Sequence, residues 1–131
     1  MPNFVIQKIG FVLNKHGKSF KGSKLLVLGL SYKKNIDDLR ESPSLKLIDE
    51  LISNGSKVEF SDPYFKEIPQ TRKHKLDLKG KELSPKVLKS ADLVILATDH
   101  DLFDYKMIKE NSKIIVDTRG RFRKSKNIIR A

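Results

Sequence analysis

Short apolar runs recur along this chain, separated by segments in which apolar residues return every three or four positions. Residues 25–30 and 93–98 are almost continuously apolar, a pattern typical of parallel strands that are covered on both faces. Shorter runs at 58–62 and 114–117 indicate two more strands. The pattern therefore predicts four buried strands.

Helical signals lie between these strands. Residues 42–55 begin with a serine and a proline, which suit a helix N-cap and first helical position, and they end at a glycine. The same signature at Ser84 precedes a short helix, and residues 105–110 predict another. Strands that alternate with helices imply right-handed crossovers and a parallel sheet. The predicted fold is α/β, a Rossmann-like doubly wound parallel sheet with helices on both faces, preceded by one N-terminal helix.

The N-terminal helix is predicted over residues 3–16, where apolar residues have a helical spacing, and Gly17 stands where a C-terminal cap belongs. It either packs on its own domain or is the end of an upstream helix. We therefore divide the chain into this helix, residues 1–17, and an α/β domain, residues 18–131.

Two segments have weaker patterns. Residues 63–80 are polar with mixed charge, and only a possible short strand at 75–78 is predicted there. The tail after Arg119 is basic, and we expect it to be frayed and without a function of its own.

The residue types that this chain lacks exclude several kinds of catalytic and metal-binding site. Without cysteine, the chain can form no disulfide, thiolate nucleophile or thiolate metal site. The histidines share no metal-ligand spacing, and the adjacent Asp37 and Asp38 tend to point apart. We expect neither a metal site nor a catalytic residue in this chain.

The net charge of +11 predicts affinity for anions, which include nucleic acid, a membrane surface and phosphorylated small molecules. No apolar run approaches the ~20 residues of a membrane-spanning helix, and the N-terminus has no signal-peptide hydrophobic region. We expect a cytoplasmic protein with no membrane partner.

Three polar segments follow predicted strands: residues 31–41, 98–100 and 118–120. In open parallel sheets, ligands bind beyond the carboxyl ends of the strands, at the point where the strand order reverses. The first segment also leads into a predicted helix, whose free N–H groups and positive dipole end favour an anion. A phosphate group is therefore the ligand expected at this edge of the sheet.

Four side chains in these segments are candidates for holding that phosphate. Lys33 would act as a point charge, Arg40 and Arg119 would each offer a planar fork of donors, and Tyr32 would offer an apolar face with a polar tip. The alternative is that they are solvated surface residues of a basic protein.

The first predicted turn lacks the glycines of a dinucleotide site, because Gly29 is followed by no second or third glycine at the required offsets. Asp62 ends the second predicted strand, where a ribose-binding acid would sit in such a site. Without the glycine turn, we expect Asp62 to be a cap or turn residue before Pro63.

Long motifs carry a resemblance to a known family. Residues 22–63, with the sequence GSKLLVLGLSYKKNIDDLRESPSLKLIDELISNGSKVEFSDP, closely resemble the start of the UDP-binding domain of UDP-glucose and GDP-mannose dehydrogenases. Residues 91–105 (ADLVILATDHDLFDY) and 113–120 (KIIVDTRG) match the same domain in the same order. The motifs are most similar to the branch that oxidises UDP-N-acetylglucosamine, or a related UDP-N-acetyl-hexosamine, to its uronic acid.

The resemblance implies a parent enzyme for surface polysaccharide biosynthesis, a homodimer or higher homo-oligomer. It would oxidise the sugar C6 alcohol to a carboxylate with two NAD in turn and a covalent cysteine intermediate. This chain has neither that cysteine nor the NAD-binding glycine turn, so we expect both in an upstream part and expect the 131 residues alone to be inactive. Residues 1–17 would be the end of the central helix that helps form the dimer.

By the same resemblance, Lys33 matches a lysine that contacts the UDP part of the substrate, and Tyr32 matches its aromatic neighbour. Arg40 matches an arginine that reaches toward the NAD, and Arg119 resembles an arginine on the substrate side. Residues 98–100 would lie at the edge of the cleft, without an assigned role. Many relatives have TRN where this chain has TRG at residues 118–120.

Two alternatives from other classes remain: a basic nucleic-acid-binding module, and a structural or dimerisation fragment. The charge motivates the first, but the chain has no tryptophan and no base-stacking motif. We expect a UDP-sugar partner and no nucleic acid.

Overall fold

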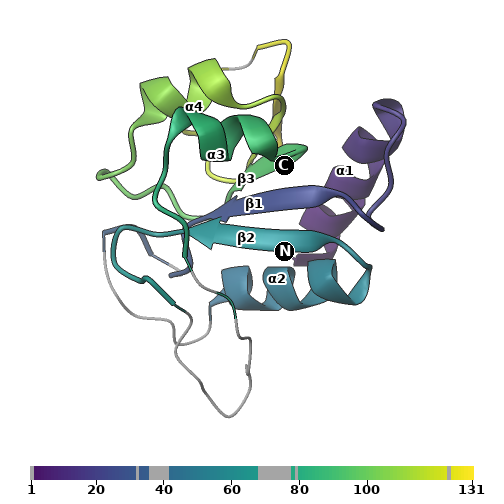
Figure 1. Cartoon of the computed structure of the whole chain (residues 1–131), viewed down its shortest axis with the longest axis horizontal. Coiled ribbons are helices and arrows are strands. Elements are labelled where there is room, and N and C mark those ends of the chain that lie inside the picture. Colours follow the sequence, from purple (N-terminus) through teal and green to yellow (C-terminus); the bar gives the residue numbers. More distant parts are fainter. Residues whose placement is uncertain (1, 32, 36–41, 68–77, 79, 124) are drawn as a thin grey trace.

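A five-stranded parallel sheet forms the middle layer of the protein (Figure 1). The computed structural model describes residues 2–31, 33–35, 42–67, 78, 80–123 and 125–131. The strand order is β2-β1-β3-β4-β5. The strands are β1 (Lys24–Leu28), β2 (Lys57–Ser61), β3 (Leu93–Leu96), β4 (Ile115–Asp117) and β5 (Ile128–Arg130).

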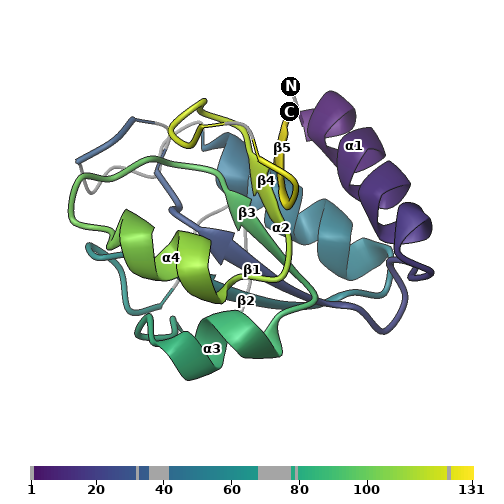
Figure 2. The ribbon, with the colours of Figure 1, turned by 90° about the horizontal axis from the view of Figure 1, so that it is seen from above.

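Helices cover both faces of this sheet, as predicted. They are α1 (Pro2–Lys15), α2 (Pro43–Ser53), α3 (Pro85–Ser90) and α4 (Tyr105–Asn111). Successive residues of a strand point to opposite faces. Leu25 and Val27 of β1 accordingly enter one core with α1 and α2, while Leu26 and Leu28 enter a second core with α3 and α4. Figure 2 shows these two helix pairs on opposite sides of the sheet.

The N-terminal helix packs on the core of the same chain. Its apolar stripe is buried against α2 and the sheet, through Val5, Ile9, Val12 and Leu13. The helix ends near Gly17, whose N–H donates to the Asn14 carbonyl. The opposite side of the helix leaves Phe4 and Phe11 largely exposed. The helix therefore packs on its own domain, which is one of the two possibilities that its sequence pattern indicates.

The basic C-terminal tail is ordered as a strand, and the expectation that it is frayed is wrong. Residues 128–130 form β5, which pairs with β4 in a parallel register that sets Ile128 beside Ile115. Phe122 and Ile128 are buried in the second core, whereas Arg123 and Lys126 are exposed. The exposed charges of Arg123 and Lys126 thus leave the apolar Phe122 and Ile128 free to pack at this edge of the sheet.

The polar region after β2 is described only in part. The short strand predicted at 75–78 lies almost entirely outside the described residues. Gly80 forms a parallel bridge with Phe60, and its N–H donates to the Lys66 carbonyl. This contact returns the chain to the edge of β2 before α3 begins.

Candidate functional site

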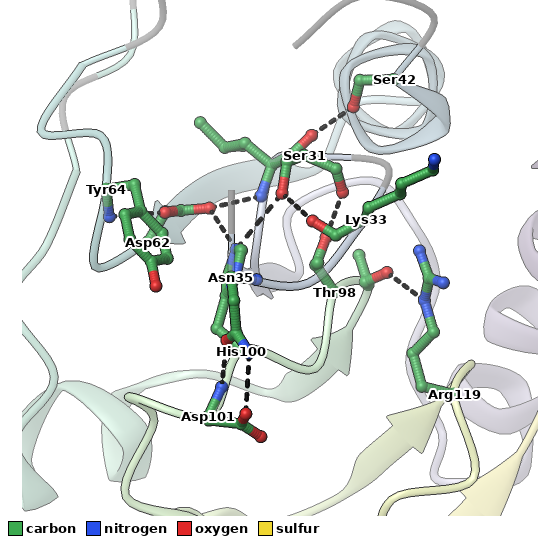
Figure 3. A network of polar contacts seen from close by, with 12 residues as sticks. Ser31, Lys33, Asn35, Ser42, Asp62, Tyr64, Thr98, His100, Asp101 and Arg119 are labelled. Carbon is green, nitrogen blue, oxygen red and sulfur yellow. Dashed lines mark hydrogen bonds and ion pairs between the residues drawn. The ribbon is translucent and has the colours of Figure 1, made fainter. Parts of the chain in front are cut away.

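The strand order reverses between β1 and β3, which lie side by side in the middle of the sheet. β2 extends the sheet on one side of this pair and β4 on the other. The described parts of the three predicted segments follow β1, β3 and β4, so they meet at the carboxyl edge (Figure 3). This is the position at which open α/β sheets bind their ligands.

The ends of β1 and β3 approach each other closely at Gly29. Its φ of +93° lies in the region that favours glycine, and this turn ends β1 two residues before the predicted limit. A Cβ on Gly29 would lie 2.4 Å from the Thr98 Cβ and 2.8 Å from the Thr98 backbone nitrogen. Only a hydrogen atom fits between the two strand ends.

Three buried hydroxyl groups hold the backbone that follows this turn. Thr98 Oγ1 donates to the Ser31 carbonyl, and Ser42 Oγ donates to the Leu30 carbonyl. Ser31 Oγ donates to the Lys33 carbonyl at 2.7 Å. Ser42 occupies the N-cap of α2, as predicted, but its side chain accepts no helix N–H because it is turned toward the loop. The loop that carries Lys33 is therefore fixed from β3 and from α2.

A buried histidine–aspartate pair connects the ends of β1, β2 and β3. Asp62 Oδ2 accepts from the Leu30 N–H at 2.7 Å and from His100 Nε2 at 3.1 Å, and its Oδ1 accepts from the Tyr64 N–H. The Asn35 backbone N–H donates to His100 Nδ1 at 2.7 Å. A backbone N–H can only donate, so Nδ1 is the unprotonated nitrogen and Nε2 carries the hydrogen. The expectation that Asp62 is a turn residue is confirmed, with this further role.

The loop after β3 makes a second set of contacts with the loop after β1. The side chain of Asn35, a residue with a φ of +63°, donates to Asp101 Oδ2 at 2.7 Å and accepts from the Asp101 N–H at 2.8 Å. Arg121 Nη1 donates to Asp101 Oδ1 at 3.1 Å. The hydrogen bond from Asn35, and then that from Arg121, lower the pKa of the Asp101 carboxyl. Loops from three strands are thus joined at one exposed carboxylate.

This carboxylate permits a titration test. Because the pKa of Asp101 is lower in the folded state than its ordinary value of 3.8, the ionised carboxylate stabilises the fold at pH values above 3.8. This stabilisation is lost as the pH falls through the lowered pKa. Carbon NMR titration should therefore give Asp101 a pKa below 3.8. Asn35→Gly, which retains the positive φ, should raise this pKa more than Arg121→Ala does, because the Asn35 donor lies closer. A larger rise with Arg121→Ala would contradict the assignment of Asn35 as the main donor.

Arg121 and Tyr105 contact each other beside the loop that follows β3. The Arg121 guanidinium lies 4.3 Å from the centre of the Tyr105 ring, and the Tyr105 hydroxyl donates to the His100 carbonyl at 2.5 Å. Burial raises the pKa of this phenol, so it remains a donor across the physiological range. The backbone of His100 is therefore held from the start of α4.

The loop after β4 is built on a buried carboxylate. Asp117 Oδ1 accepts from the N–H groups of Arg119 and Gly120, at 2.8 and 2.9 Å, and its Oδ2 accepts from the Phe122 N–H at 2.8 Å. Arg119 Nε donates to the Ala97 carbonyl at 2.9 Å, which orients the guanidinium at the end of β3. Gly120 has a φ of +71°, a region that both Gly and Asn tolerate, so TRG and TRN suit the same turn.

The structure brings two of the predicted site residues to one edge. Lys33 and Arg119 are both exposed. Lys33 follows Ser31, which Thr98 holds, and Arg119 is bound to the neighbouring Ala97. In Figure 3 their side chains extend on the same side of the polar network. Tyr32 and Arg40, the other two predicted residues, lie outside the described part of the chain.

His100, Asn35 and Ser31 are among the residues of this network for which the sequence predicts no role. The position of His100 after a strand predicts a place at the edge of the site, but spacing alone does not indicate that its ring is buried against Asp62. For Asn35, the signal in the sequence is its tolerance of a positive φ in a loop. The contacts themselves join residues more than 60 positions apart, which no local pattern reveals.

Comparison with known proteins places this geometry in a family. A profile described as the UDP-glucose/GDP-mannose dehydrogenase family, UDP binding domain, matches residues 26–124. The chain belongs to this family. The part of this UDP-binding domain that matches includes the strand ends that follow β1, β2, β3 and β4.

Curated relatives agree with the profile. The chain is 40% identical over 103 residues to a UDP-N-acetyl-D-mannosamine dehydrogenase of Campylobacter jejuni, a match that covers 78% of this chain and 24% of that protein. It is 32% identical over 128 residues to a UDP-N-acetyl-D-mannosamine dehydrogenase of Methanocaldococcus jannaschii, covering 92% of this chain and 27% of that protein. The UDP-binding domain thus spans about a quarter of the length of these relatives.

A solved structure has the same fold. The UDP-D-ManNAc dehydrogenase from Pyrococcus horikoshii superposes with a TM-score of 0.75 at 27% identity, covering 98% of this chain and 30% of that chain. The five-stranded parallel sheet and its helices are therefore the architecture of a domain from a nucleotide-sugar dehydrogenase.

The residues of this UDP-binding domain do not fit NAD at the first turn. The single glycine, Gly29, has the space beside its Cα filled by Thr98, so it serves the contact between strands. A pyrophosphate site in a dinucleotide fold needs further glycines, and the next residues are Leu30 and Ser31.

No acidic or histidine cluster with metal-binding geometry occurs among the described residues. None of the helices in that part of the chain has the length and apolar character needed to cross a membrane.

Proposed function

We propose that the carboxyl edge of β1, β3 and β4 binds the UDP part of a nucleotide sugar. The proposal rests on one observation: the exposed Lys33 and Arg119 both lie at the edge where the strand order reverses. Ser31, which binds the Lys33 carbonyl, is bonded to Thr98, and Arg119 is bonded to Ala97, so both are connected to the residues that follow β3. A diphosphate is an anion that suits an ammonium group and a planar guanidinium together. The net charge of +11 adds a long-range attraction for such a ligand.

Each residue has a distinct part in this proposal. Lys33 places a point charge on one side of the diphosphate, while Arg119 presents donors whose direction is set by its bond to the Ala97 carbonyl. Tyr32 and Arg40 keep the roles that the family resemblance implies, beside the UDP and toward the NAD. These two roles are predictions from the sequence.

In the longer protein, this domain would be a substrate clamp. Binding energy from the UDP, remote from the reacting sugar carbon, would orient the C6 alcohol against groups outside these 131 residues. The NAD-binding site would lie in that other part of the protein. The cysteine that holds the intermediate would lie there too, because this chain has no cysteine.

The sugar itself is proposed to be a UDP-N-acetyl-hexosamine, oxidised to a uronic acid for surface polysaccharide. The names of the Campylobacter and Methanocaldococcus relatives support that class.

The N-terminal helix is proposed to contribute to a homodimer of that protein. Phe4 and Phe11 lie two helical turns apart on one face and are 56% and 63% exposed. Exposed aromatic residues in this arrangement suit a second helix surface, as the family resemblance implies.

Lys33→Ala tests the proposed site. Loss of one charge-assisted contact to the diphosphate should weaken UDP binding by about 1.5–3 kcal/mol, measured by calorimetric titration of the 131-residue chain. Lys34→Ala is the matched control, since it removes the same charge from the next residue of the same loop.

If both variants lose affinity equally, the attraction is non-specific and Lys33 is not a site residue. An oligonucleotide titration at two salt concentrations tests the nucleic-acid alternative. Salt-dependent oligonucleotide binding without UDP binding would replace the present proposal with that one.

A further inference from the structure

We infer that His100 is a positioning residue for the UDP site, which it serves by holding the loop of Lys33 through the Asn35 backbone. This inference rests on the proposed function, because it assigns His100 to the same diphosphate site. His100 lies at the centre of the network in Figure 3, between Asp62 and Asn35.

The imidazole ring is enclosed and has few alternative positions. Its side chain is 0% exposed, as is that of Asp62. The ring centroid lies 4.9 Å from that of Tyr64 and 5.6 Å from that of Phe103. A ring packed between two aromatic side chains cannot turn over without displacing them. The two ring nitrogens therefore keep different neighbours.

Those neighbours assign different tasks to the two nitrogens. Nε2 donates to the Asp62 carboxylate, which also accepts the Leu30 N–H and is thereby fixed to the end of β1. With the hydrogen held on Nε2, Nδ1 presents a lone pair to the Asn35 N–H. A hydrogen on Nδ1 would set two donors against each other, and Asn35 would have to move.

Lys33 lies between the two anchored ends of one short segment. Ser31 anchors the first end, where its carbonyl accepts from Thr98 and its hydroxyl binds the Lys33 carbonyl. Asn35 anchors the second end, where it bonds to His100 and Asp101. Releasing the second anchor would let Lys33 leave the position that faces the diphosphate, at a cost in ligand affinity.

Two substitutions separate the tasks of the ring. In His100→Asn, the side-chain oxygen takes the place of Nδ1 and can accept the Asn35 N–H, while the bond to Asp62 is lost. In His100→Gln, the side-chain amide reaches the place of Nε2, but no acceptor faces Asn35. We expect calorimetric titration to show that His100→Gln binds UDP about tenfold more weakly than the unsubstituted chain. His100→Asn should bind UDP within about twofold of the unsubstituted chain. His16→Gln is the control, since the His16 ring bonds to the Val12 carbonyl at the end of α1, away from the carboxyl edge of the sheet.

The melting temperatures of the three variants distinguish positioning from general stability. A merely structural histidine would lower UDP affinity and melting temperature together in both His100 variants, with no rescue by asparagine, and that result would overturn the inference. If the unsubstituted chain binds no UDP, the proposed function fails first. If it binds UDP and both His100 variants bind equally well, the inference fails while the proposed function stands.

Ring-nitrogen NMR shifts of the unsubstituted chain give a test that needs no variant. Nδ1 of His100 should have the shift of an unprotonated nitrogen and Nε2 that of a protonated one. The reverse assignment would overturn the inference even if His100→Gln does not fold.

Discussion

Gly29→Ala should lower the free energy of unfolding of the domain by about 3 kcal/mol or more, although it only adds a methyl group and removes no contact. Two costs combine. A non-glycine residue at a positive φ costs roughly 1–2 kcal/mol, and overpacking a filled site costs typically 1–3 kcal/mol. Both apply, because φ is +93° and the new Cβ would lie 2.4 Å from the Thr98 Cβ. Chemical denaturation followed by circular dichroism measures the loss.

Gly22→Ala is the control that separates the two costs. Gly22 has a φ of +83°, but no atom lies within 4 Å of a Cβ built on it. Its replacement should therefore incur only the backbone cost of roughly 1–2 kcal/mol. Equal losses in the two variants would mean that the approach of the strand ends at Thr98 imposes no strain.

Asp117→Ala should also destabilise the domain by about 3 kcal/mol, because hydrogen bonds to a charged acceptor contribute roughly 1.5–3 kcal/mol each and their contributions are not additive. Asp117 is 1% exposed, and its carboxylate accepts three backbone N–H groups of the loop after β4. The same variant should weaken UDP binding, since Arg119 lies in that loop and its N–H is one of the groups that Asp117 accepts. Denaturation and calorimetric titration of one sample measure both effects.

Asp104→Ala is the matched control for this loss. Asp104 is exposed and accepts one N–H, from Met107, at the start of α4. An N-cap of this kind contributes typically about 1 kcal/mol, and UDP binding should be unchanged. A loss in Asp117→Ala no larger than in Asp104→Ala would show that the loop after β4 does not depend on its buried carboxylate.

The local pattern predicted most elements of this fold correctly. The helix that begins after Ser42 and the one after Ser84 start as predicted, because Ser-Pro pairs act within a single turn. The four predicted strands are present, and their ends agree with the predicted ones to within two residues. Continuous apolar runs identify buried strands, but the turn that ends a run, as at Gly29, depends on the neighbouring strand.

The C-terminal tail, which its composition predicts to be frayed, forms a strand instead. Its basic residues dominate the composition after Arg119, so the three-residue strand β5 was hidden in a charged segment. A strand this short has no periodicity of its own. It exists because β4 offers an unpaired edge and because Phe122 and Ile128 fill the second core.

Lys33 and Arg119 could be named as candidates from the family motifs and from the position of each polar segment after a strand. These are properties of order along the chain, since parallel strands bring every carboxyl end to one edge of the sheet. The sequence alone therefore determined the fold class, the edge that carries the candidate site and the charge that attracts an anion.

Only the tertiary structure decided how that edge is held together. His100 donates to Asp62 and accepts from Asn35, and Arg119 donates to Ala97. These hydrogen bonds join segments that are distant in sequence and depend on distances of about 3 Å. A shift of one residue in any strand would break them, yet would leave the apolar pattern almost unchanged. Packing, which sets the register of the strands and the depth of each side chain, turns a set of polar residues into an oriented site.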